Sequence, residues 1–215
     1  MTMGFRMPEA VDQHELQDRN HGAFNPDRRI DISHVTDAIA DVFIPDRRIG
    51  KLYTSRDERI SQAEGTDGKW SGEPGNSWVR PNLDTEAGRA AANKLAEYGL
   101  KDVRFRDGVV DFSKCCEESA TIPNMTSKIG SNRRQALDAV AEKWNEQGKT
   151  QDDGSKWTRD AVAGWASKNG LEFHECSDMK TCQFVPAEIH AYFKHFGGRA
   201  ECKIRDGEIR REWSK

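Results

Sequence analysis

The stretch "FHECSDMKTCQFVPAEIHAYFKHFGG", residues 173–198, decides the fold of the C-terminal part of the chain. Apolar and polar residues alternate through "LEFHEC" at 171–176, which predicts a strand, and "CQFV" at 182–185 predicts a second, short strand. The segment that follows opens with a proline, which suits a first helical turn, and it predicts a helix that two glycines end at 197–198. The sequence therefore predicts a unit of two strands and one helix (ββα) at about 170–198.

Three of the six histidines lie in this unit, namely His174 on the first strand, His190 in the helix and His195 five residues later. A strand histidine and a helix histidine can face a common point and hold a divalent cation. Another imidazole, with a pKa of about 6.5, can take a proton from water at neutral pH. A metal ion and a general base are together sufficient to hydrolyse a phosphodiester. His190 and His195 are about 140° apart on an ideal helix, so they share a metal only if the helix ends or tightens between them.

Two other interpretations of the histidines remain open. They could be ordinary half-buried side chains, or His174 and His190 could join Cys176 and Cys182 in a closed structural zinc site. A closed site leaves no coordination position for water or phosphate, so it indicates a zinc-stabilised nucleic-acid-binding module without catalysis. The odd number of cysteines, five, and the lack of a CxxC pair give no evidence for a disulfide framework.

The composition sets limits on the class of protein. Charged residues make up 32% of the 215 residues and hydrophobic residues 35%, and no run approaches the roughly 18 apolar residues of a membrane span. We expect no membrane partner, and no classical signal peptide is visible. The net charge of -3 is unusual for a nucleic-acid-binding protein, but local basic residues can still contact phosphate. The residues expected to do so are Arg133, Arg134 and Lys194.

The ββα stretch resembles the C-terminal motif of the HNH/endonuclease VII superfamily, the ββα-metal nucleases. It is most similar to the WHH subgroup of bacterial polymorphic toxin domains, whose motif contains Trp-His-His, Met-Gln-Leu-Val-Pro, a helix histidine and His-x-Gly-Gly. The matching residues here are Phe173-His174-Glu175, "CQFVP" at 182–186 and "IHAYFKHFGG" at 189–198. Upstream, "GEPGNS" at 72–77 and "FRDGVVDFS" at 105–113 are also similar to segments of such toxins.

The resemblance implies catalytic roles for His174 and Glu175 and a metal site made of His190, His195 and Glu175. One departure from the family motif leaves these roles open, because Glu175 stands where the second histidine of the triplet falls. In one register His174 is the general base, which we favour because imidazole suits that task at neutral pH, and Glu175 assists the metal. In the other register His174 is the metal ligand and Glu175 is the base.

The rest of the chain predicts an α+β protein with helices around a C-terminal ββα-metal (HNH-like) unit. Residues 1–65 differ in composition and are expected to be an N-terminal region or linker from a longer delivery polypeptide, with a short helix at 32–43. Residues 66–215 are expected to be the nuclease domain. In it the sequence predicts a Gly-rich loop at 64–82 and a hairpin at 103–113. It also predicts three helices, at 85–100, 132–148 and 155–170.

The resemblance implies a function as well as a fold. We expect a metal-dependent endonuclease, with DNA as the first substrate and RNA as the second, that acts as an antibacterial toxin or effector domain. The cofactor is expected to be a divalent metal, Mg²⁺ first and Zn²⁺, Mn²⁺ or Ni²⁺ as alternatives. The expected partners are DNA or RNA and a cognate immunity protein. The protein is expected to be secreted without a classical signal peptide and to act in the cytoplasm of the target cell.

Overall fold

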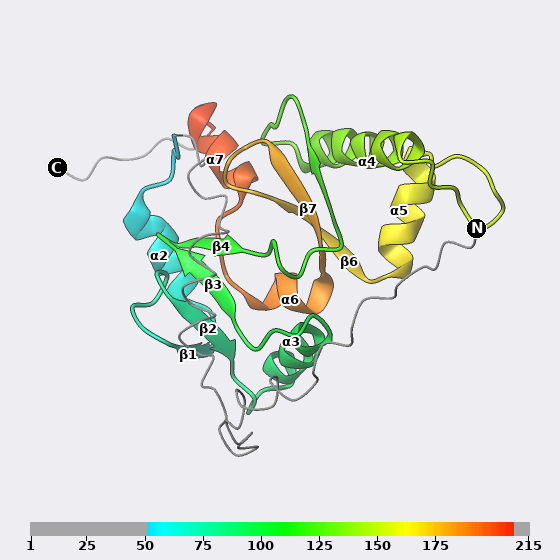
Figure 1. Ribbon diagram of the computed structural model, residues 1–215. Coiled ribbons are helices and arrows are strands. Elements are labelled where there is room, and N and C mark those ends of the chain that lie inside the picture. The colour runs from blue at the N-terminus through cyan, green and yellow to red at the C-terminus, as the bar shows by residue number, and fades with distance from the viewer. Residues whose placement is uncertain (1–50, 209–215) are drawn as a thin grey trace, which may run out of the picture. The chain divides into compact units, whose positions relative to one another are not determined.

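A computed structural model describes residues 51–208 of the chain (Figure 1). This part contains six helices and two antiparallel sheets, which confirms the predicted α+β class. The helix expected at 32–43 lies outside the described residues. None of the described helices combines the length and the apolar character that crossing a membrane requires.

The first sheet has four strands in the order β1-β2-β3-β4, with bounds Gly68–Trp70, Trp78–Pro81, Val103–Arg106 and Val109–Asp111. The hairpin predicted at 103–113 is confirmed as β3 and β4. Its turn consists of Asp107 and Gly108, whose φ angles are 49° and 77°, as a two-residue hairpin turn requires. The prediction of a loop at 64–82 was wrong in part, because β1 and β2 lie inside it. Three-residue and four-residue strands among glycines leave too short a pattern to detect.

The second sheet has three strands in the order β5-β7-β6. The two predicted strands are confirmed as β6, Leu171–Glu175, and β7, Thr181–Pro186. They pair antiparallel, with His174 opposite Gln183 and Glu175 opposite Cys182. The third strand, β5 at Glu118–Thr121, was not predicted, since four mostly polar residues give no clear alternation.

Four helices precede the ββα unit within the described residues 51–208. They are α2 at Arg56–Glu64, α3 at Glu86–Glu97, α4 at Ile129–Glu146 and α5 at Arg159–Lys168. Ser55, Thr85 and Thr158 cap α2, α3 and α5 by accepting a hydrogen bond from a backbone N–H of the first turn. The three predicted helices are confirmed as α3, α4 and α5, with bounds shifted by a few residues.

The helix of the ββα unit is shorter than predicted. Helix α6 spans only Ala187–Tyr192, and the chain turns to an extended conformation at Phe193, with φ -83° and ψ 112°. The two glycines at 197–198 do not end this helix, because they lie at the start of a further one, α7 at Gly198–Arg205. His195 therefore lies on a loop between α6 and α7 rather than on a helix.

The three-stranded sheet separates two hydrophobic cores. On one face Phe173 and Phe184 pack with residues of α4 and α5. On the other face Val185 packs with α6, α3 and the inner face of the four-stranded sheet, for example with Ile189, Leu95 and Phe105. His174 and Gln183 point to this second face, because side chains alternate along a strand.

The residues just before the predicted domain boundary at 65 contact the domain. Glu201 of α7 is fully buried, and its carboxylate accepts hydrogen bonds from the backbone N–H groups of Tyr53 and Thr54 and from the Thr54 hydroxyl. In α2, Arg59 donates from Nε to the carbonyl oxygen of Asp107, at 2.9 Å. The division at residue 65 stays a prediction, and these contacts favour an earlier start of the domain.

Candidate functional site

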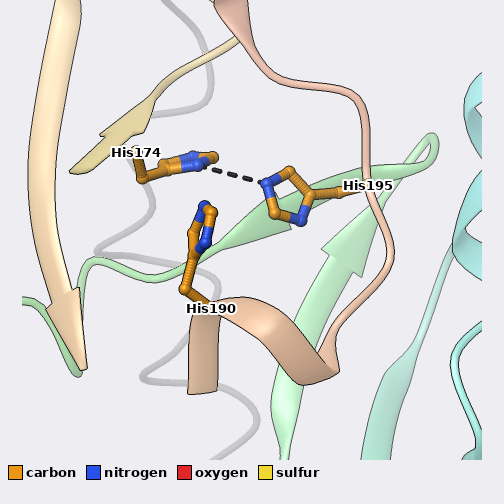
Figure 2. A group of neighbouring side chains, drawn as sticks. All are labelled: His174, His190 and His195. Atoms are coloured by element: carbon orange, nitrogen blue, oxygen red, sulfur yellow. Dashed lines mark hydrogen bonds between the residues drawn. The ribbon is translucent and has the colours of Figure 1, made fainter. Parts of the chain in front are cut away.

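The three histidines of the ββα unit converge on one point (Figure 2). His174 comes from β6, His190 from the last turn of α6 and His195 from the loop that follows. Each ring offers one nitrogen, and these nitrogens all lie within 4.8 Å of one another. Among residues 51–208, these histidines form the one group of three or more side chains that could together hold a metal ion. The condition that the helix must end before His195 is met, because α6 stops at Tyr192.

Phe112 forms one wall of the cluster. Its ring centroid lies 5.1 Å from that of His174, 5.9 Å from that of His190 and 5.4 Å from that of His195. Phe112 is 1% exposed and directly follows β4. A single apolar side chain therefore contacts all three imidazoles and keeps water from that side.

A backbone hydrogen bond orients His195. Its Nδ1 lies 2.7 Å from the carbonyl oxygen of Phe193, and a carbonyl only accepts, so Nδ1 carries the proton. The lone pair of Nε2 then points to the centre of the cluster, where Nδ1 of His174 is 3.2 Å away. A hydrogen bond from the outer ring nitrogen is the usual support of a metal-ligating histidine.

Burial keeps the imidazoles neutral. It lowers the pKa of His174 far below its ordinary value, and the neighbouring His195 and His190 lower it further. Burial also lowers the pKa of His190, and it lowers that of His195 to about 4 despite the opposing effect of the Phe193 carbonyl. A neutral imidazole is the form that binds a metal ion, so the electrostatics of the site favour a ligand role.

Glu175 is not part of this cluster. It follows His174 in β6 and so points to the opposite face of the sheet, where its Oε1 accepts a hydrogen bond from Nδ2 of Asn132 at 2.9 Å. Burial raises the pKa of this carboxyl, while the Asn132 hydrogen bond and the charge of Arg199 lower it. The structure thus gives Glu175 a separate, buried polar environment between β6 and α4.

The alternative zinc site of Cys176, Cys182, His174 and His190 is not formed. Neither thiol belongs to the group of potential ligands. Cys182 is fully buried on the face of β7 that packs against α4 and α5, away from the imidazoles. Burial raises the pKa values of both thiols above their ordinary value, which disfavours the thiolate that binds zinc.

The three basic residues expected to contact phosphate are all exposed, but they lie on two different elements. Arg133 and Arg134 are on the first half of α4, and Lys194 is next to His195 on the loop after α6. The backbone N–H of Lys194 donates to the Thr66 hydroxyl at 2.8 Å, which fixes the chain beside the histidines. Lys194 is therefore the one of the three that is adjacent in sequence to the histidine cluster.

Several residues of the site were not predicted. The position of Phe112 depends on how the four-stranded sheet packs against α6, which no local pattern specifies. Gln183 could have been found, because the alternation of β7 and its pairing with His174 place it on the same face of the sheet. Asn132 was given no role beyond the start of the helix predicted at 132–148, although it is fully buried and its Nδ2 donates a hydrogen bond to Glu175.

Comparison with known families gives one match. Residues 102–197 match the model for the DNase/tRNase domain of colicin-like bacteriocin. No curated protein sequence matches the chain significantly. The matched residues begin just before β3 and include all three histidines and Phe112. Over residues 102–197 the chain therefore carries a phosphodiester-hydrolysing nuclease domain of the toxin type found in colicin-like bacteriocins.

Proposed function

We propose that the protein is a metal-dependent endonuclease toxin that cleaves DNA and that the three-histidine cluster is its metal site. The cluster carries this proposal, because it lies inside the segment that matches the nuclease family. The finer likeness, to the WHH subgroup of polymorphic toxins, belongs to the proposal as well. The family description covers both DNases and tRNases, so RNA is the second candidate substrate.

The residues present fit a divalent metal ion. Three ligand nitrogens that share one ion at about 2.1 Å lie roughly 3–4 Å apart, and the nitrogens of this cluster need only small side-chain rotations to reach that spacing. When bound, the ion would neutralise phosphate charge and stabilise the departing oxygen. An all-imidazole ligand set suits Zn²⁺ or Ni²⁺ better than Mg²⁺, so the expected preference for Mg²⁺ stays a prediction for a metal series to test.

We further propose that His174 and Glu175 divide the ligand and base roles, with His174 as the ligand. Support comes from the position of the His174 ring, whose Nδ1 is 3.2 Å from Nε2 of His195 on the common side of the sheet. Glu175 is then the candidate base by its place in the motif. Because Asn132 holds its carboxylate on the opposite face of the sheet, this role requires the carboxylate to leave Asn132 and reach around the end of β6 to the attacking water. This is the alternative register of the family motif, and it replaces our preference for His174 as the base.

The division of roles is tested by comparing metal binding with cleavage. His174→Ala should lose both metal binding, measured by calorimetry, and plasmid cleavage. Glu175→Gln should keep metal binding within a few-fold while cleavage falls by at least two orders of magnitude. If Glu175→Gln loses the metal and His174→Ala retains it, the roles are reversed, and if both variants cleave normally the site is elsewhere.

The activity is tested by incubating the purified protein with plasmid DNA and with total RNA. Each substrate is combined with Mg²⁺, Mn²⁺, Zn²⁺, Ni²⁺ or a chelator, and His190→Ala serves as the matched inactive variant. We expect plasmid cleavage that requires metal and is absent in the variant. Cleavage of RNA alone would identify the tRNase alternative, and no cleavage of either substrate would refute the proposal.

As a toxin domain, the protein is proposed to act in the cytoplasm of a target cell and to be held inactive by a cognate immunity protein in the producing cell. Expression in a bacterium without that inhibitor should stop growth and degrade the nucleoid. Growth curves and nucleoid staining for the wild type and His190→Ala, at equal expression, measure this. Normal growth with intact nucleoids in the wild type would contradict the toxin role.

A further inference from the structure

We infer that the outer face of the four-stranded sheet is a second nucleic-acid contact surface, which holds the phosphate backbone of duplex DNA outside the histidine site. This inference rests on the proposed function and extends it to how the substrate is held. The surface is defined by Lys69, Trp78, Arg80, Arg104, Arg106 and Lys114 and is called the basic sheet face below.

The alternation of the strands places these side chains on one face. In β2, Val79 and Pro81 are buried, so Trp78 and Arg80 point outward. In β3, Val103 and Phe105 are buried. Arg104 and Arg106 therefore share the outer side with Trp78 and Arg80, since side chains of a strand alternate between the faces. Lys69 of β1 lies opposite Arg80 in the register and belongs to the same face.

Trp78 organises two of the cations. Arg104 is its cross-strand partner, with the guanidinium carbon 5.7 Å from the centre of a Trp78 ring. Nζ of Lys114, which follows β4, is also 5.7 Å from the centre of a Trp78 ring. The face of an aromatic ring attracts cations, so Trp78 restricts the positions of both basic side chains. Both charges can then contact the same anion.

Like charges that lie close together on this face destabilise the folded protein. Lys69 and Arg80 are directly opposite one another on neighbouring strands, and like charges at such positions are unfavourable. Two carboxylates lie near these cations in the described part of the chain: Asp102, 3.4 Å from Arg80, and Asp111, opposite Arg104. Five basic side chains gather on this face although the net charge of the chain is -3, so the basic character is a local feature.

The basic sheet face ends beside the histidine site. β4 is one of the two edge strands of the sheet, and the next residue, Phe112, contacts all three imidazoles on the inner side. Lys114 on the outer side follows two residues later. A duplex that passes the histidine cluster can therefore keep its flanking phosphates on Lys114 and Arg104, which selects long polyanionic substrates over short ones.

The test measures the salt dependence of DNA binding in chelator, where no cleavage is expected. The probe is a fluorescent 30-base-pair duplex, and the double variant Arg104→Gln/Lys114→Gln is compared with the control Lys156→Gln/Lys168→Gln, which neutralises two exposed lysines near α5. The slope of log Kd against log salt should become shallower by about 1.8 in the first variant, because each phosphate contact contributes about 0.9. The control should keep the wild-type slope. Lys114→Gln alone, a substitution in an exposed loop, should make the slope shallower by half as much, about 0.9. This single variant is used if the double variant does not fold.

A second measurement separates this inference from the proposed function. With metal present, the ratio of plasmid cleavage to hydrolysis of a small chromogenic phosphodiester should fall on the order of tenfold in Arg104→Gln/Lys114→Gln. If the wild type cleaves plasmid but slope and ratio are unchanged in the variant, the basic sheet face is overturned and the nuclease stands. If the slope changes only with a structured RNA probe, duplex DNA is the wrong occupant. If the wild type neither binds nor cleaves nucleic acid, both proposals fail.

Discussion

Nε2 of His195 lies 3.2 Å from Nδ1 of His174, although the two residues are 21 positions apart and belong to a loop and a strand. The contact exists because α6 ends at Tyr192 and the Phe193 carbonyl binds the far side of the His195 ring. This geometry changes what is expected of the two residues. A continuous helix would have turned His195 away from His190, whereas the observed loop makes His195 a member of the cluster.

Gly198, the first residue of α7, is expected to be essential for the position of His195 on the preceding loop. A Cβ atom there would meet the carbonyl oxygen of Cys176 at 2.4 Å and the sulfur of Met125 at 2.5 Å, both too close. Gly198→Ala should therefore displace the start of α7 and lower both metal affinity and cleavage, by about tenfold or more. Calorimetry and plasmid cleavage measure the two effects.

Gly164→Ala is the matched control for that substitution. Gly164 is exposed inside α5, and a Cβ atom there would meet no other atom within 4 Å. Its replacement should stabilise the protein by about 0.5–1 kcal/mol and leave cleavage unchanged. Equal effects of the two substitutions would show that the crowding at Gly198 is not what positions the loop.

The start of the folded domain can be tested by truncation. Removal of residues 1–65 removes the backbone N–H groups of Tyr53 and Thr54 and the Thr54 hydroxyl. The buried Glu201 carboxylate then loses the three hydrogen bonds that these groups donate. A chain of 66–215 should be less stable than one of 51–215 by on the order of 3 kcal/mol, because a buried charge loses its hydrogen bonds. Urea unfolding measures the difference, and Glu201→Gln in the longer chain should reproduce part of it. Equal stability of the two chains would support the predicted boundary at 65.

Glu118 should contribute to stability in a pH-dependent manner. Burial alone would raise its pKa, but hydrogen bonds from Lys143, the Ser119 backbone and Trp144 outweigh burial and lower the pKa below its ordinary value. A carboxylate with a lowered pKa stabilises the fold above its unfolded-state pKa, and the contribution is lost as the pH falls through the folded value. Glu118→Gln should thus be destabilised at pH 7, and the difference from the wild type should shrink between about pH 5 and pH 3. A constant difference over this range would contradict the ion pair with Lys143.

The sequence was sufficient to predict β6, because Leu171 and Phe173 alternate with polar residues, and β7, because "CQFV" is a short, mostly apolar run. It was also sufficient to predict the hairpin at Asp107-Gly108. It also identified the three histidines. The sequence could not show where α6 ends, because "AEIHAYFKHF" continues a helical pattern. Only tertiary contacts interrupt that pattern, namely the packing of Phe193 in the second core and the close approach of the glycines to β6. Strand alternation alone would have placed Glu175 on the face opposite His174. The family motif instead led us to assign His174 and Glu175 to the same site.

The sheet that carries His174 also has a mechanical consequence. β7 sends Phe184 into one core and Val185 into the other, and the imidazoles lie against the face between β7 and α6. Neither core can unfold without displacing one of the three histidines, so loss of the histidine cluster and loss of structure should occur in a single cooperative step. A partly unfolded chain would then lack the assembled cluster, which would form again only once both cores have folded.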